Sequence, residues 1–110
     1  MIDWDRIFEL REEVGNESFS EIIEIFVDEV RDAIDVLRNK VGFDSLEADL
    51  HFLKGSALNL GFAAFASLCE TGEWMASQGK AEEVDIAAIV ASFEMCLAEF
   101  LDGLPARMAA

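Results

Sequence analysis

The 110-residue sequence contains little proline, cysteine, histidine or positive charge, and it contains no tyrosine. The two cysteines, Cys69 and Cys96, lie far apart in apolar segments, which excludes a disulfide framework and a zinc-binding spacing and is typical of a reducing compartment. Lys and Arg together number 8 against 23 Asp and Glu, which gives a net charge of −15. A surface this acidic repels nucleic-acid phosphates and anionic lipids, so we expect neither nucleic acid nor a membrane as a partner.

The sequence also has no hydrophobic run approaching the roughly 20 residues of a transmembrane helix, and its acidic start lacks the basic region of a signal peptide. Its length suits one domain, residues 1–110, and the 53% of hydrophobic residues allows a packed core. We therefore expect a single cytoplasmic domain.

Apolar residues recur every three or four positions along nearly the whole chain, whereas no segment alternates with the period of a β-strand. The spacing predicts a short helix over about 3–14 and four longer helices over about 18–41, 45–61, 63–78 and 85–102. Amphipathic helices joined by short loops favour an all-α fold, an antiparallel up-down four-helix bundle with the short N-terminal helix as an addition.

Sequence signals also predict where these helices begin and end. Ser18, with Glu21 three residues later, matches an S-x-x-E capping box and predicts the start of the second helix. Gly103 and Pro105 predict the end of the last helix, because proline removes a backbone donor. Gly72 falls inside a predicted helix, at a point where we expect another helix to approach closely.

The sequence lacks the residues that most catalytic mechanisms need. A di-iron bundle needs two Glu-x-x-His motifs, and the chain has one histidine. Neither a G-x-x-x-x-G-K-[ST] loop nor a G-x-G-x-x-G turn is present, so we expect no ATP binding, no bound cofactor or metal, and no autonomous kinase activity. An ordinary enzyme is the least favoured interpretation.

The one histidine, His51, lies in a predicted helix whose residues 46, 50, 53, 57 and 60 form an apolar stripe expected to face the core. On an ideal helix His51 lies roughly 140° from this stripe, Lys54 roughly 80° and Gly55 roughly 180°. The imidazole should therefore face solvent beside a cation and an open space. A neutral imidazole, whose ordinary pKa is about 6.5, is a competent nucleophile that can accept a phosphoryl group. Two other interpretations stay open: His51 as an ordinary surface residue, and Gly55 as a packing contact.

The sequence from His51 to Gly61, HFLKGSALNLG, resembles the signature of histidine-containing phosphotransfer (HPt) domains, H-x-[LI]-K-G-[SA]-[SA]-x-x-[LI]-G. The resemblance implies a phosphorelay intermediate of two-component signalling, in which His51 accepts a phosphoryl group and exchanges it with the aspartate of response-regulator receiver domains. Lys54 would then flank the phosphoryl group, and Gly55 would keep the approach clear. Members of this family often carry a polar amide on the next helix, near the histidine. Residues 70–73 offer carboxylates instead, so the resemblance assigns no role to these residues.

The same resemblance implies the partners. Response-regulator receiver domains would supply Mg²⁺ and an acidic pocket, and a hybrid histidine kinase is a further candidate partner. We expect a free-standing monomer that acts as a phosphoryl carrier more than as an enzyme. The alternative, from a different class, is a helical adaptor that binds a partner without phosphotransfer, and such an adaptor would tolerate the loss of His51.

Docking of a receiver domain needs an accessible surface around the histidine. Leu58 and Phe62 lie at roughly 120° and 160° on the helical wheel, which predicts an apolar patch beside it. The alternative stays open that Leu58 packs against another helix and that Phe62, just past Gly61, has left the helix. Glu47 and Asn59 are assigned to the rim of this surface, and Phe52, on the opposite flank, is expected to be buried against a neighbouring helix. Because receiver active sites are acidic, we expect the surface around the histidine to be less negative than the rest.

Overall fold

The computed structural model describes residues 1–108 of the chain, so residues 109 and 110 of the expected domain lie outside the described part. These residues contain five α-helices and no strand, apart from an isolated bridge between Ile2 and Phe62, which confirms the all-α class. Within 1–108, none of the helices is both long and apolar enough to cross a membrane. The helices are α1 (Trp4–Val14), α2 (Asn16–Asn39), α3 (Leu46–Asn59), α4 (Ala63–Ser77) and α5 (Ile86–Met108), with a 3₁₀ helix, η1 (Ala81–Glu83), between α4 and α5.

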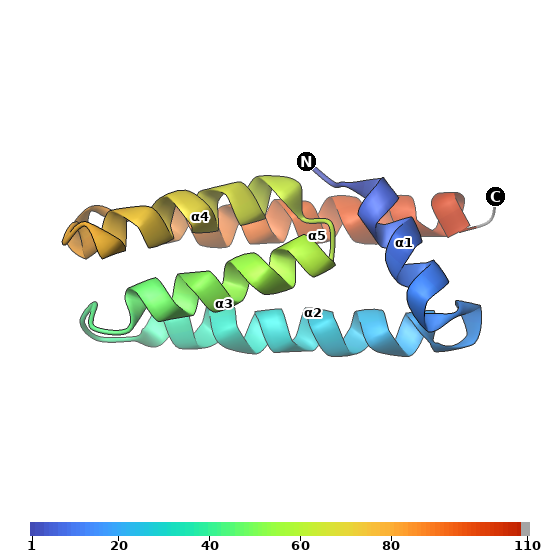
Figure 1. The fold of residues 1–110 in the computed structure, drawn as a ribbon, viewed down its shortest axis with the longest axis horizontal. Helices are drawn as coiled ribbons and strands as arrows, with labels where there is room; N and C mark the ends of the chain where they lie inside the picture. The colour runs from blue at the N-terminus through green and yellow to red at the C-terminus, as the bar shows by residue number, and fades with distance from the viewer. Residues whose placement is uncertain (109–110) are drawn as a thin grey trace.

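Four of the helices lie lengthwise, and α1 lies across one end of them (Figure 1). Helix α2 packs on α3, α3 on α4, α4 on α5 and α5 on α2. The colours in Figure 1 show that successive helices from α2 to α5 run in alternate directions. The edge formed by α3 and α4 is therefore on the opposite side of the molecule from the edge formed by α2 and α5.

The core is formed by the apolar stripes of the helices. On α3 the stripe lies as the spacing predicts, because each of its members is at most 4% exposed: Leu46, Leu50, Leu53, Ala57 and Leu60. The prediction of a close approach at Gly72 is also confirmed, since a Cβ atom there would lie 2.8 Å from Cδ1 of Leu50. This fit between α3 and α4 fixes how the two helices are rotated about their axes.

The capping box predicted at Ser18 is wrong. Helix α2 begins at Asn16, and its N-cap is Gly15, whose φ of 83° is a conformation that glycine adopts readily. The N–H of Gly15 donates to the carbonyl of Arg11, so the same residue ends α1 and starts α2. Ser18 consequently lies inside the first turn. The other end of α2 is also earlier than expected, at Asn39, and Val41 is almost fully exposed.

The predicted end of the last helix at Gly103 is also wrong, because α5 continues through Gly103 and Pro105 to Met108. The indole of Trp4 stacks on Phe100, with ring centroids 6.0 Å apart, and a Cβ atom on Gly103 would lie 2.8 Å from this indole. The guanidinium of Arg107 covers the same indole at 4.7 Å. These contacts with the N-terminal helix support the final turns of α5 and outweigh the local signals to stop.

Candidate functional site

The imidazole of His51 lies on the outer face of α3, where 69% of the side chain is exposed, as predicted. Its Nδ1 atom lies 2.8 Å from Oε2 of Glu73 on α4. An ionised carboxylate can only accept hydrogen bonds, so a neutral imidazole carries its proton on Nδ1 and donates a hydrogen bond from there to Glu73. The other ring nitrogen, Nε2, then carries the lone pair and is the nucleophilic atom.

The second oxygen of Glu73, Oε1, lies 2.7 Å from Nζ of Lys54, one turn after His51 on α3. The contacts with Lys54 first, and with His51 second, lower the pKa of Glu73 below its ordinary value, against an opposing effect of burial. The contact with Glu73 likewise raises the pKa of Lys54. Glu73 is therefore ionised and Lys54 protonated at neutral pH, and one carboxylate positions both side chains.

Gly55 faces open space. A Cβ atom built on this residue would meet nothing within 4 Å, so Gly55 is no packing contact between helices. The prediction that it leaves room next to the histidine is confirmed. A glycine inside a helix costs about 1 kcal/mol relative to alanine, and no close packing compensates for this cost here.

A shallow groove between α3 and α4 adjoins the ion pair of Lys54 and Glu73. Its lining contains three carboxylates and one lysine, so the surface on this side of the histidine is not less acidic than the rest, contrary to expectation. Glu47, which was assigned to the rim of the docking surface, lies in this lining. The groove is lined by Glu47, Lys54, Glu70, Glu73, Trp74 and Ser77.

Of the two apolar residues assigned to the docking surface, the structure exposes one. Leu58 is 55% exposed and remains available to a partner. Phe62 is fully buried, so its assignment is wrong. The chain turns at Gly61, which has a φ of 70°, and the helical wheel does not extend past this turn. The Phe62 ring instead packs edge-on against Phe100, with centroids 5.5 Å apart.

Of the two residues on the flanks of the docking surface, Asn59 and Phe52, the structure places Phe52 differently from expectation. Asn59 is exposed, and its Oδ1 accepts a hydrogen bond of 3.4 Å from Arg6 on α1, so a side chain of the N-terminal helix reaches this surface. Phe52 is 50% exposed, so the prediction that a neighbouring helix buries it is wrong. Phe52 and Leu58 therefore present apolar surface on either side of the histidine.

Sequence reasoning assigned no role to Glu73. The carboxylates at 70–73 were visible in the sequence, but the residue that faces His51 depends on how α4 is rotated against α3. The two cysteines are buried, and burial raises the pKa of the Cys69 thiol to about 12 and also raises the pKa of Cys96, so neither is a reactive thiolate at neutral pH. Within residues 1–108, no group of three His, Cys, Asp or Glu side chains is placed to hold a metal ion.

A family model described as Hpt domain matches residues 21–107, which include α3, α4, most of α2 and nearly all of α5, but not α1. Searches of curated proteins and of solved structures found no match.

Proposed function

The chain belongs to the Hpt domain family, the domains of histidine phosphotransfer in two-component phosphorelays, and we propose that His51 is its phosphoacceptor. The proposal covers exchange of the phosphoryl group with the aspartate of response-regulator receiver domains. The observation that carries it is the exposed imidazole whose Nδ1 is held by Glu73. This contact leaves Nε2 free for attack and exposed to a partner.

The transfer step needs little from this chain beyond position and charge. Nε2 of His51 attacks the phosphorus of a phosphorylated aspartate, the N–P bond forms, and the P–O bond breaks so that the aspartate carboxylate leaves. Transfer in the reverse direction uses the same atoms. Lys54 supplies a cation close to the incoming phosphoryl group, and the open space at Gly55 admits the partner.

The partner supplies the remaining chemistry. The chain has no loop for ATP, so the phosphoryl group comes from a receiver domain or a hybrid histidine kinase, and Mg²⁺ would be bound by the receiver. Leu58, with Glu47 and Asn59 at its rim, is proposed as part of the docking surface. The proposal also takes the chain as one cytoplasmic, monomeric domain over 1–110, arranged as an antiparallel up-down four-helix bundle.

A phosphotransfer assay with a panel of phosphorylated receiver domains tests the function. We expect labelled wild-type protein and no label on His51→Gln, whose fold is checked by circular dichroism. The label should be stable in base and labile in acid, as a phosphoramidate is.

The competing function is a helical adaptor that binds a partner without phosphotransfer. Small phosphoramidate donors provide a second route to His51 that needs no cognate receiver. If neither the panel nor these donors label the folded wild-type protein, the adaptor is the better interpretation.

A further inference from the structure

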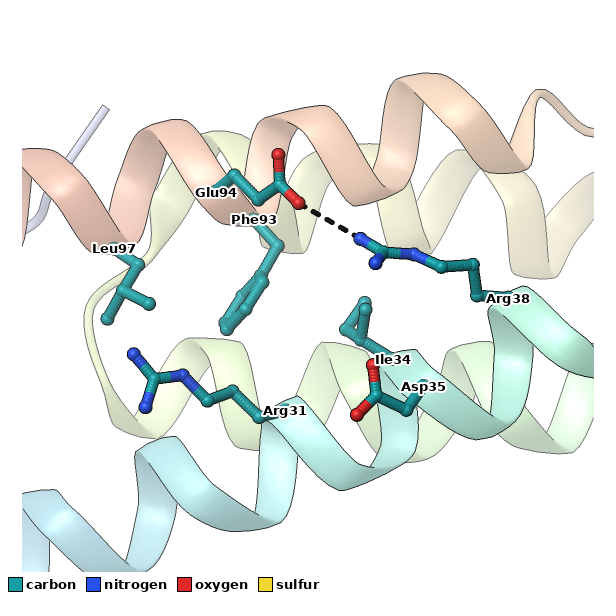
Figure 2. Close-up of a pocket in the computed structure, with 7 residues that line it drawn as sticks. All are labelled: Arg31, Ile34, Asp35, Arg38, Phe93, Glu94 and Leu97. Carbon is teal, nitrogen blue, oxygen red and sulfur yellow. Dashed lines mark hydrogen bonds and ion pairs between the residues drawn. The ribbon is translucent and has the colours of Figure 1, made fainter.

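A second groove lies between α2 and α5, on the opposite side of the molecule from His51 and Glu73. It encloses about 330 Å³, which is within the range of small-ligand sites. Its floor is apolar and its rim is charged (Figure 2). The lining residues are Arg31, Ile34, Asp35 and Arg38 from α2, with Phe93, Glu94 and Leu97 from α5.

The two arginines of this groove differ in their contacts. Arg38 donates a hydrogen bond of 2.9 Å to Glu94, and this ion pair closes one end of the groove. Within residues 1–108, no carboxylate forms an ion pair with Arg31. Figure 2 shows the Arg31 guanidinium extended toward Leu97 and away from Asp35. An unpaired cation in a chain of net charge −15 is thus placed beside an apolar floor.

We propose that this groove binds a small amphipathic carboxylate. Its carboxylate would bind the Arg31 guanidinium, whose parallel N–H groups match two carboxylate oxygens. Its apolar body would lie over the floor at Phe93 and Leu97, which are at most 9% exposed, so the contact with Arg31 supplies most of the affinity. The proposal does not depend on phosphotransfer, because the groove residues come from α2 and α5, whereas His51, Lys54 and Glu73 come from α3 and α4.

The other charged groups of the groove determine how affinity changes on substitution. Glu94 is neutralised by Arg38, so its charge opposes an anion only weakly. Asp35, one turn after Arg31 on the same helix, forms no ion pair within the described residues and repels a bound carboxylate. Removal of the Arg31 charge should therefore weaken binding, and removal of the Asp35 charge should strengthen it.

The test uses 4-phenylbutyrate as the probe, with ¹⁵N-labelled full-length protein and amide chemical shifts as the readout. We expect shifts concentrated at 31–38 and 93–97, with a millimolar Kd. Arg31→Gln should weaken binding about threefold and Asp35→Asn should strengthen it about twofold, as estimated for exposed charge pairs. Both side chains are exposed, so both variants should fold and keep phosphotransfer at His51.

The neutral analogue 4-phenylbutanol is the control for the charged group. Equal affinity for the acid and the alcohol, or unchanged affinity in Arg31→Gln, would overturn the proposal. So would shifts that map to α3 and α4, since the probe would then bind the histidine face. Because the readout is binding, a failed phosphotransfer assay would leave this result unaffected.

Discussion

The Nδ1 atom of His51 and the Oε2 atom of Glu73 lie 2.8 Å apart, and this contact joins α3 to α4 at the exposed face of the molecule. It orients the imidazole and assigns its proton to Nδ1. The same carboxylate binds Lys54, so the imidazole and the neighbouring cation share one positioning residue.

Replacement of Glu73 should affect the rate and the position of phosphorylation. In the wild type we expect the phosphoryl group on Nε2, detected by ³¹P and ¹⁵N NMR. Glu73→Ala should slow transfer between about tenfold and a hundredfold, the range seen where a carboxylate that orients a metal-binding imidazole is removed. Glu70→Ala removes the same charge from the same groove without touching His51, and it should keep most of the rate. Equal rates in the two variants would contradict a positioning role.

The ion pair of Glu73 and Lys54 should make stability depend on pH. The lowered pKa of Glu73 means that its contribution is complete above the ordinary carboxyl pKa of about 4.3 and is lost as pH falls through the lowered value. The raised pKa of Lys54 means that its contribution is lost as pH rises through that value, above about 10.4. Urea unfolding of wild type and Glu73→Gln should therefore differ most between about pH 5 and 10. A difference that stays constant down to pH 2 would exclude this linkage.

Truncation of the two tryptophans should affect the free energy of unfolding to very different extents. Trp4 is partly buried and contacts Phe100, Gly103 and Arg107, so Trp4→Ala should lower the free energy of unfolding by about 2 kcal/mol. Trp74 is 60% exposed, so Trp74→Ala should change the free energy of unfolding by less than about 0.5 kcal/mol. Urea denaturation followed by circular dichroism measures both. A negligible effect of Trp4→Ala would show that α1 does not support the end of α5.

Much of the helical pattern could be predicted from the sequence, because periodicity is a local property. The stripe from Leu46 to Leu60, the exposure of His51 and the open space at Gly55 all followed from angles on one helix. The prediction failed where the backbone changes direction. Phe62 lies beyond the turn at Gly61, so its wheel angle carried no information about its surroundings.

Contacts between segments that are distant in the sequence also could not be predicted from local sequence patterns. Gly103 and Pro105 do not end α5, because Trp4, about one hundred positions earlier in the chain, packs on the last turns. The pairing of Glu73 with His51 depends on the rotation of one helix against another. Both cases have the same cause: tertiary packing overrode the local stop signals in α5, and it selected Glu73 where the local sequence made no choice.

Gly55 and Gly72 form a matched pair of helical glycines for substitution. Gly55→Ala should raise the free energy of unfolding by up to about 1 kcal/mol, because alanine is the better helix former and its Cβ meets open space. Gly72→Ala should lower it by about 1–3 kcal/mol, because the added Cβ overlaps the side chain of Leu50. The larger Gly55→Gln should fold normally and slow transfer from a receiver several-fold. Destabilisation by Gly55→Ala would show that the space is not open in solution.

Substitutions of Leu58 and Phe62 should distinguish an effect on receiver docking from an effect on folding. Leu58→Glu places a charge on an exposed position, so it should change the free energy of unfolding by less than about 0.5 kcal/mol. It should nevertheless slow transfer from a phosphorylated receiver, because a charge in the centre of an interface loses apolar contact and must be desolvated. Phe62→Ala should instead cost about 3–5 kcal/mol of stability, since its ring is fully buried against Phe93 and Phe100.

Transfer from a small phosphoramidate donor provides the control for Leu58, because such a donor needs no docking surface. Leu58→Glu should accept label from this donor at the wild-type rate while its transfer from the receiver is slow. If both rates fall together, Leu58 acts on the imidazole itself. If neither rate falls, the receiver approaches from the side of Phe52, whose half-exposed ring is then the residue to replace.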